Sequence, residues 1–222
     1  MRMTARIAVL ISGEGRNLQA LIDACAAGRI DGRIVVVLSN RADAGGIARA
    51  LRAGIAVELL SHRDYASREA YDTALVSRLA AYRPDIVVLA GFMRILTPLF
   101  IGAYAGRMLN IHPSLLPRHP GLHTHEAALA AGDAEHGATV HFVTDELDGG
   151  PRVIQGQFKV RADDTPQTLA ARVMAEIELK IYPQAVAWMA RGELALTSRG
   201  VELRGRILAA PVGMDAVEEA FR

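Results

Sequence analysis

An amide and an imidazole stand two residues apart in the stretch "LNIHPSLLPRHPG", where Asn110 is followed by His112. On an extended chain residues i and i+2 share a side, about 6 to 7 Å apart at their Cα atoms. A hydrogen-bond-donating amide and a proton-carrying imidazole could together act on a carbonyl-type centre. Three prolines then stiffen the chain that leaves this pair, namely Pro113, Pro117 and Pro120. An isolated histidine that is satisfied by a backbone carbonyl remains the alternative.

A carboxylate in the acidic turn "VTDELDGGP" could complete this pair. Asp148 precedes Gly149 and Gly150, which allow a tight return of the chain. A carboxylate near His112 would favour the protonated imidazole, the form that can act as an acid. A hairpin turn of solvated acids is the alternative for this segment.

A glycine-containing loop, "ISGEGRN", follows the first apolar run and opens a helical stretch. The amides of Gly15, Arg16 and Asn17 would stand at the helix N-terminus, where they favour an anion such as a phosphate. Leu18 occupies the third glycine position of the dinucleotide fingerprint, so the loop does not match that motif. A plain structural turn stays open.

Composition narrows the classes of partner. The 222 residues carry 25 basic and 24 acidic side chains, and 51% of them are hydrophobic. A net charge of +1 without charged blocks indicates neither nucleic acid nor a membrane as partner, so we expect small molecules. Cys25 is the single cysteine and is interpreted as a structural thiol, and the first apolar run is too short for a signal or a membrane span. A cytoplasmic protein is expected.

Histidines are frequent after the proline segment, which raises the question of a metal. The histidines in question are His123, His125, His136 and His141. No carboxylate or cysteine accompanies them at the spacing of a ligand motif, so we expect no metal.

Four continuous apolar runs in the first half predict buried parallel strands, at residues 6–12, 33–40, 56–61 and 85–91. Helical stretches at 17–28, 44–54 and 67–82 separate them. This alternation predicts an α/β fold with a Rossmann-like, doubly wound, mostly parallel sheet that has helices on both faces.

The second half changes character and should carry the chemistry. Strand-like runs are expected at 107–111, 138–144 and 153–160, separated by loops rich in Pro, Gly and His. A long helix is predicted over 165–192, with Thr165 as its cap, Pro166 at its first position and Pro183 as a kink. We expect one domain over 1–192, and a C-terminal tail over 193–222 with a short hairpin and a frayed end.

Five segments in order resemble one family: "ISGEGRNLQALI", "AGFMRILTPLF", "MLNIHPSLLPRHPGLHTHEAAL", "HFVTDELDGGPRVIQ" and "DDTPQTLAARV". The chain resembles the phosphoribosylglycinamide formyltransferases, folate-dependent enzymes of purine synthesis, over residues 6–192. The resemblance implies the formyltransferase fold, with the nucleotide bound by the N-terminal half, and folate binding and catalysis in the C-terminal half. It also implies transfer of the formyl group of 10-formyltetrahydrofolate to the amine of glycinamide ribonucleotide.

The resemblance gives each motif a role. Asn110 would hold the formyl oxygen, His112 would act as general acid, and Asp148 would keep His112 protonated and order a water. The ribonucleotide would be held by Gly15, Arg16, Asn17 and Glu178. The folate pocket would be lined by Arg68, Met93, Arg94, Ile95, Leu96, Asn110, Thr144, Asp145, Glu146, Leu147 and Asp148.

Two places depart from the family pattern. Counting back from Tyr182 selects Glu178, counting forward from Arg172 selects Ile177, and Glu176 is a further choice. In the phosphate loop, Glu14 and Arg16 replace small or neutral residues, and their charges act on a phosphate in opposite directions.

Two other enzymes of the same fold also use an Asn, a His and an Asp around a formyl group. A methionyl-tRNA formyltransferase needs a basic C-terminal domain, for which too few residues follow Leu194. A formyltetrahydrofolate hydrolase usually has an N-terminal regulatory domain, whereas this chain starts on its first strand. A catalytically silent folate or nucleotide binder would lack a member of the set. We therefore expect the transferase, as a monomer or homodimer.

Overall fold

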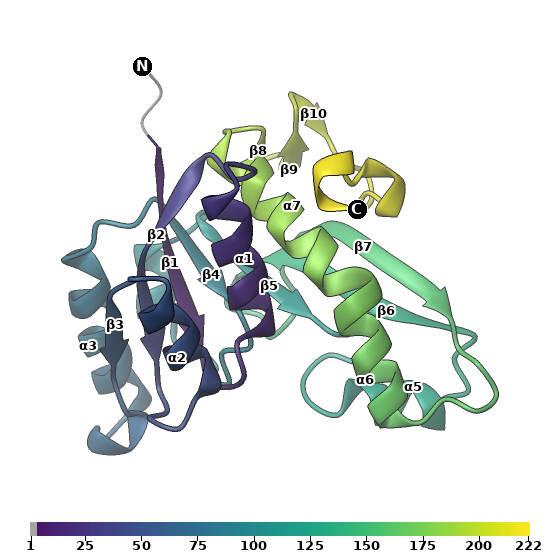
Figure 1. The fold of residues 1–222 in the computed structure, drawn as a ribbon, viewed down its shortest axis with the longest axis horizontal. Helices are drawn as coiled ribbons and strands as arrows, with labels where there is room; N and C mark the ends of the chain where they lie inside the picture. Colours follow the sequence, from purple (N-terminus) through teal and green to yellow (C-terminus); the bar gives the residue numbers. More distant parts are fainter. Residues whose placement is uncertain (1–3) are drawn as a thin grey trace.

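A seven-stranded sheet forms the centre of the computed structural model, which describes residues 4–222 (Figure 1). The strands are β1 (Ala5–Ile11), β2 (Gly32–Ser39), β3 (Val57–Leu59), β4 (Ile86–Leu89), β5 (Met108–His112), β6 (Glu135–Phe142) and β7 (Arg152–Lys159). Their order is β3-β2-β1-β4-β5-β6-β7. All pairs from β3 to β5 are parallel, and β6 is antiparallel to both its neighbours. The first three residues of the domain predicted over 1–192 lie outside the described residues.

Strand β1 shows why the apolar runs are continuous. Its residues Ile7, Val9 and Ile11 belong to one buried cluster, whereas Ala8 and Leu10 belong to a second cluster across the sheet. Because successive side chains point to opposite faces, a strand covered on both faces must be apolar at every position. The predicted doubly wound α/β fold is therefore confirmed.

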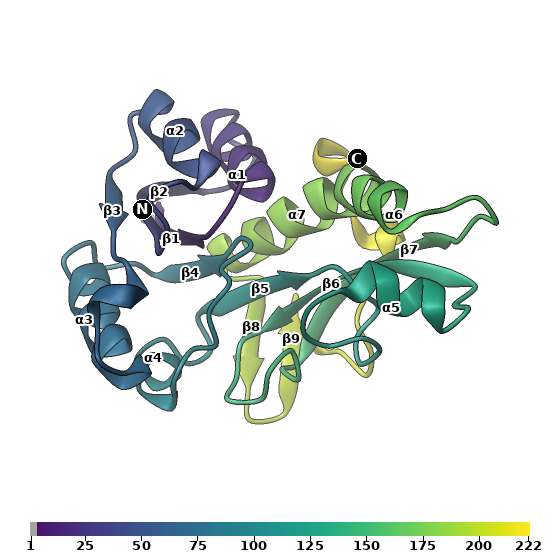
Figure 2. The same ribbon diagram turned by 90° about the horizontal axis from the view of Figure 1, so that it is seen from below.

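Helices cover both faces of the sheet. The first five are α1 (Arg16–Ala26), α2 (Gly45–Arg52), α3 (Arg68–Ala80), α4 (Pro98–Ala103) and α5 (Thr124–Ala130), with a 3-10 turn at His62–Asp64 between β3 and α3. Figure 2 shows α1 and α2 on one side of the sheet and α3 and α4 on the other. The predicted helices of the first half are present within a few residues of their expected ends.

The C-terminal helix has three parts: α6 (Pro166–Arg172), a π-helical segment (Val173–Glu178) and α7 (Leu179–Ala190). Thr165 caps α6 as predicted, since its side chain accepts from the backbone N–H of Thr168. Pro183 lies inside α7, and the departure from α-helical geometry precedes it. This helix packs on α1 and on strands β4, β6 and β7.

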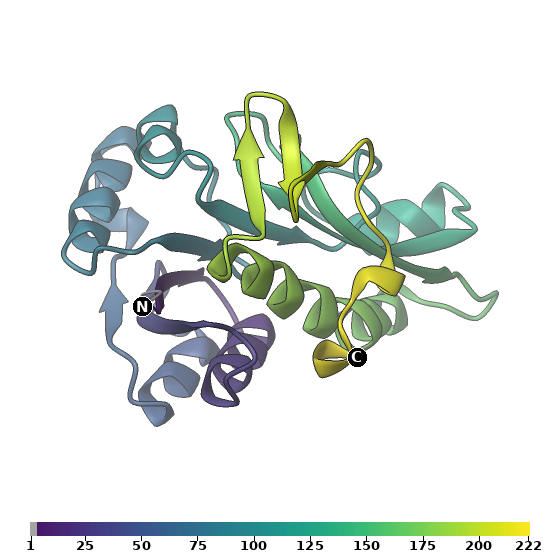
Figure 3. The same cartoon turned by 90° about the horizontal axis from the view of Figure 1, so that it is seen from above.

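The tail begins with the predicted hairpin and does not end as predicted. Strands β8 (Leu194–Thr197), β9 (Gly200–Leu203) and β10 (Arg206–Ile207) form a small antiparallel sheet, and 3-10 turns follow at Met214–Ala216 and Glu219–Phe221. Val217 and Phe221 are only 1% and 4% exposed and join the main core. The expected frayed end is wrong, because these side chains hold the last residues against α7 (Figure 3).

Substitution of Phe221 tests whether the tail stabilises the domain. We expect Phe221→Ala to lower the free energy of unfolding in urea by about 3 kcal/mol, because it empties a buried aromatic site. Ile207→Ala, in the same tail but at a side chain that is 39% exposed, should cost much less. Equal and small losses in both variants would contradict the role of Phe221.

Candidate active site

The candidate site lies where the carboxyl ends of β1, β4 and β5 meet. The glycine loop follows β1, the segment Gly91–Leu96 follows β4, and Asn110 and His112 lie at the end of β5. Between β1 and β4 the chain changes the direction in which it adds strands to the sheet. A crevice at such a point is the usual place for a ligand in an open α/β sheet.

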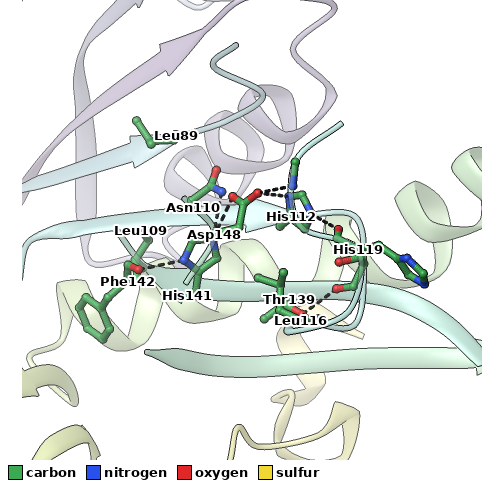
Figure 4. Close-up of polar contacts among 12 residues, drawn as sticks. Leu89, Leu109, Asn110, His112, Leu116, His119, Thr139, His141, Phe142 and Asp148 are labelled. Carbon is green, nitrogen blue, oxygen red and sulfur yellow. Dashed lines mark hydrogen bonds and ion pairs between the residues drawn. The ribbon is translucent and has the colours of Figure 1, made fainter. Parts of the chain in front are cut away.

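The structure brings Asp148 to His112, 36 positions earlier in the chain, as the sequence predicted. Asp148 Oδ2 lies 3.4 Å from His112 Nδ1, and their side chains are only 10% and 7% exposed. Asp148 has a positive φ of 52°, the left-handed conformation that lets the chain turn back before Gly149. Figure 4 shows its carboxylate between His112 on one side and Asn110 and His141 on the other.

Both ring nitrogens of His112 face an oxygen. Nε2 lies 2.9 Å from the carbonyl oxygen of His119, and Nδ1 faces Asp148. An imidazolium, with a proton on each nitrogen, donates to both acceptors. The backbone N–H of Gly121 also donates to Asp148 Oδ2, at 2.8 Å, so the chain from Pro113 to Gly121 holds both members of the pair.

His141 orients Asn110 and was not assigned to the site from the sequence. It is the register partner of Asn110 across β5 and β6. Its Nδ1 donates to the carbonyl oxygen of Phe142 at 2.8 Å, which leaves Nε2 to accept from Asn110 Nδ2 at 3.1 Å. Burial lowers the pKa of His141, which keeps this neutral tautomer. Only the strand register, which the sequence does not reveal, identifies this residue.

Two cavities adjoin these side chains, one of about 750 Å³ and one of about 100 Å³. Of the residues predicted for the folate pocket, two line only the larger cavity, Arg68 and Met93. Four line only the smaller cavity, namely Leu96, Thr144, Asp145 and Glu146. Both are lined by Arg94, Ile95, Asn110, Leu147 and Asp148. Every side chain predicted for the folate pocket therefore borders one of the cavities.

The larger cavity has an apolar wall that remains open to solvent. Met93, Ile95, Leu122 and Leu147 line it and are all more than half exposed. Leu122 was not predicted, because nothing in its local sequence separates it from an ordinary loop leucine. Arg68, the first residue of α3, stands at the edge and donates to the carbonyl oxygen of Ile95 at 3.1 Å. Such a wall suits a flat, largely apolar ligand with a charged end.

The glycine loop has the conformation expected of an anion-binding helix start. Gly15 is the N-cap of α1 with a φ of 73°, and it has no side chain that could cap the helix. The first residue of α1, Arg16, is exposed. The loop packs closely on α2, because Gly46 N–H donates to the carbonyl oxygen of Gly13 at 3.0 Å. The free N–H groups and the helix dipole favour an anion there.

Glu178 lies beside this loop, and the other two positions considered for it do not. Asn17 Nδ2 donates to Glu178 Oε2 at 2.6 Å, and both side chains are buried. Ile177 belongs to the core, and exposed Glu176 pairs with Arg172 at 3.2 Å. Burial raises the pKa of Glu178, an effect that the Asn17 hydrogen bond partly offsets.

A hydroxyl joins the phosphate loop to the cavity wall. Ser12 Oγ accepts from the backbone N–H of Met93 at 2.8 Å and donates to Asn40 Oδ1 at 2.6 Å. Ser12 N–H donates in turn to the carbonyl oxygen of Gly91 at 3.1 Å. The two halves of the site are thus fixed relative to each other.

The remaining histidines contact one another, an acid or, for His62, the amide of Asn40. His125 Nδ1 lies 2.9 Å from His136 Nε2. Within residues 4–222, no group of three or more His, Cys, Asp or Glu side chains is arranged to hold a metal ion. The same part of the chain has no helix with the length and apolar character needed to cross a membrane.

Comparison with known proteins decides the family. Residues 5–186 match the family model described as formyl transferase. The phosphoribosylglycinamide formyltransferase of Escherichia coli (strain K12) is 54% identical over 202 residues, which are 91% of this chain and 95% of that protein. This chain belongs to the phosphoribosylglycinamide formyltransferase family. It is therefore a formyl-transferring enzyme, and its co-substrate is 10-formyltetrahydrofolate.

Solved structures and larger relatives agree with this assignment. A phosphoribosylglycinamide formyltransferase from Coxiella burnetii has a TM-score of 0.89 and 47% identity, with 94% of this chain and 98% of that chain covered. A human trifunctional purine biosynthetic protein, adenosine-3, is 44% identical over 196 residues, 88% of this chain and 19% of that protein. The formyltransferase family thus also occurs as one part of a multifunctional chain.

The buried carboxyl of Glu178 predicts a pH-dependent stability. Because folding raises its pKa above the ordinary 4.5, Glu178 stabilises the fold most below that pH and progressively less as the pH rises. Glu178→Gln lacks this ionisation and should not lose stability in this way. The free energy of unfolding of the variant minus that of the wild type should therefore increase as the pH is raised from 4.5. Urea unfolding of both proteins across this range is the measurement. A difference that is constant or falls with pH would contradict the raised pKa.

Proposed function

We propose that the chain transfers the formyl group of 10-formyltetrahydrofolate to the amine of glycinamide ribonucleotide. The products are formylglycinamide ribonucleotide and tetrahydrofolate, in the synthesis of purines. The observation that carries the proposal is the buried Asp148 and His112 pair beside Asn110, at the wall of a cavity of about 750 Å³. Membership of the family supports the same reaction.

Asn110, His112 and Asp148 act on the formyl carbon. Asn110 donates a hydrogen bond to the formyl oxygen, whose negative charge grows as the amine attacks. His112 gives a proton to the leaving nitrogen of tetrahydrofolate, and Asp148 with an ordered water returns the proton that the amine loses. Since the amide and the imidazole leave one strand two residues apart, one formyl group can reach both.

The glycine loop binds the phosphate of the ribonucleotide. Backbone N–H groups of Gly15, Arg16 and Asn17 hold the phosphate oxygens, and Arg16 adds a positive charge. Glu178, held by Asn17, accepts hydrogen bonds from the sugar or the glycinamide group. The N-terminal half of the domain over 1–192 thus binds the nucleotide, and the C-terminal half binds the folate and catalyses the reaction. The tail over 193–222 lies apart from both tasks.

The segment after β4 and the acidic turn enclose the folate. Backbone groups near Met93 and Leu96 pair with the pterin, and the exposed apolar side chains cover its faces. Thr144, Asp145, Glu146 and Leu147 close the opposite wall of the smaller cavity. Arg68 and Arg94 stand where a negatively charged tail of the folate would emerge.

A formyltetrahydrofolate hydrolase is the second candidate, because the same three side chains could direct water onto the formyl group. The phosphate-binding loop favours a phosphorylated acceptor over water.

The single cysteine, free and partly buried, fits a cytoplasmic enzyme. The two substrates are its partners, without nucleic acid or membrane, and it acts as a monomer or homodimer.

Replacement of His112 tests the catalytic assignment. We expect His112→Ala to lower kcat for formyl transfer by about 10²- to 10⁴-fold, because it removes the general acid. Product formation from the two substrates is followed, with formate measured alongside and folding checked by circular dichroism. Equal turnover in variant and wild type would refute the assignment, and release of formate without acceptor would support the hydrolase.

Two glycines with similar backbone angles provide a matched test of the phosphate loop. Gly15 and Gly28 have φ angles of 73° and 68°, but a Cβ on Gly15 would lie 2.7 Å from Gly46 Cα, whereas a Cβ on Gly28 would contact nothing within 4 Å. Gly15→Ala should therefore raise KM for glycinamide ribonucleotide, while Gly28→Ala should leave it unchanged. Steady-state kinetics with each substrate varied is the measurement. Similar KM values in both variants would count against phosphate binding at Gly15.

A further inference from the structure

A second histidine and carboxylate pair lies behind His112, and the proposed reaction does not use it. His119 Nε2 lies 2.8 Å from Asp133 Oδ2, and Arg118 Nη1 lies 3.0 Å from Asp133 Oδ1. The side chains of His119 and Asp133 are 18% and 12% exposed. Both are largely shielded from water, and the contact with Asp133 fixes the direction of the His119 ring.

The backbone of His119 reaches the catalytic histidine, while its ring points away from it (Figure 4). Its carbonyl oxygen is the acceptor that His112 Nε2 faces at 2.9 Å. His119 itself has a φ of 53°, in the left-handed region that favours glycine. A residue other than glycine keeps this conformation only where its surroundings hold it.

Contacts on both sides of His119 do hold it. The ring is fixed by Asp133, the residue three positions beyond α5. Ser114 Oγ donates to the carbonyl oxygen of Arg118 at 2.7 Å, on the other side. The position of the carbonyl on Nε2 of His112 therefore depends on the pairing of His119 with Asp133.

We propose that His119 and Asp133 are positioning residues that hold the Nε2 proton of His112 on the carbonyl of His119, so that the proton exchanged in the reaction is the one on Nδ1. The inference rests on the proposed function of His112 as the acid. Nδ1 is the nitrogen that faces Asp148, and both residues line the larger cavity. A ring that is free to turn would present either nitrogen to the substrate.

The proton balance of the reaction follows from this assignment. As the bond between the formyl carbon and the folate nitrogen breaks, its electron pair stays on the nitrogen, which takes the proton of Nδ1. The attacking amine loses one proton, which Asp148 and a water return to Nδ1. Nε2 keeps its proton throughout. The titratable groups around His112 are Asp148, His125 and His141, and His119 contributes only its carbonyl on this side.

Four variants test the proposal. His119→Leu and Asp133→Ala remove the pair, and His119→Gln keeps a donor for Asp133. Arg78→Gln, on α3, breaks an ion pair of 2.9 Å with Glu58 of β3, away from both cavities. For each protein, kcat and both KM values are measured, and unfolding midpoints show that it folds. The tautomer of neutral His112 is read by ¹⁵N NMR, with His112→Gln identifying its signals.

The proposal predicts both the tautomer of neutral His112 and the change in kcat for each variant. In the wild type, neutral His112 should carry its proton on Nε2, and in His119→Leu and Asp133→Ala it should be a mixture of both tautomers. Their kcat should fall about 10- to 100-fold with little change in KM, because the acid is misplaced in the transition state. His119→Gln should restore much of kcat, and Arg78→Gln should match the wild type.

Other results would overturn the proposal. A proton on Nδ1 of neutral His112 in the wild type would do so, as would a tautomer that is the same in all variants, even if kcat falls. Unchanged kcat in both His119→Leu and Asp133→Ala would do so as well. Failure of the proposed function is distinguishable, because the wild type and Arg78→Gln would then form no formylglycinamide ribonucleotide while the tautomer comparison still gave its answer.

Discussion

The contact between Asp148 and His112 is the constraint on which the site depends. A carboxylate and an imidazole that are both about nine-tenths buried lose most of their hydration, and only close partners compensate for that loss. The N–H of Gly121 on Asp148 and the carbonyl of His119 on His112 are those partners. The segment that follows β5 must therefore be ordered before substrate binds, which is where its three prolines and its side-chain contacts act.

The positions of Asn110 and Asp148 depend on the change from parallel pairing, between β4 and β5, to antiparallel pairing, between β5 and β6. With β6 running against β5, His141 lies opposite Asn110, and Val143 follows at the start of the acidic turn. The turn then returns to the same two strands, which places Asp148 against His141 and His112. One reversed strand thus produces both the amide orientation and the carboxylate contact.

Local patterns in the sequence predicted the fold and the core of the site. The continuous apolar runs, the glycine loop, the Thr165 cap and the spacing of Asn110 and His112 each depend on a few neighbouring residues, and each is found in the structure. His141 and the carbonyl of His119 were not predictable, because they enter through strand register and through a main-chain atom that any residue possesses. The buried end of the tail was missed for a similar reason, since the burial of Val217 and Phe221 depends on the position of α7 and on no local periodicity.

Glu178 shows how a helix can correct the direction of a side chain. An α-helix turns by about 100° per residue, so one residue more or less would rotate Glu178 away from Asn17 and bring a neighbour into its place. The π-helical segment Val173–Glu178 accommodates more residues per turn, so it shifts the phase of the helix before α7 begins. As a result Ile177 remains in the core while Glu178 contacts Asn17. Counting along the sequence in either direction assumes a regular helix, so the choice between these two positions required the observed backbone.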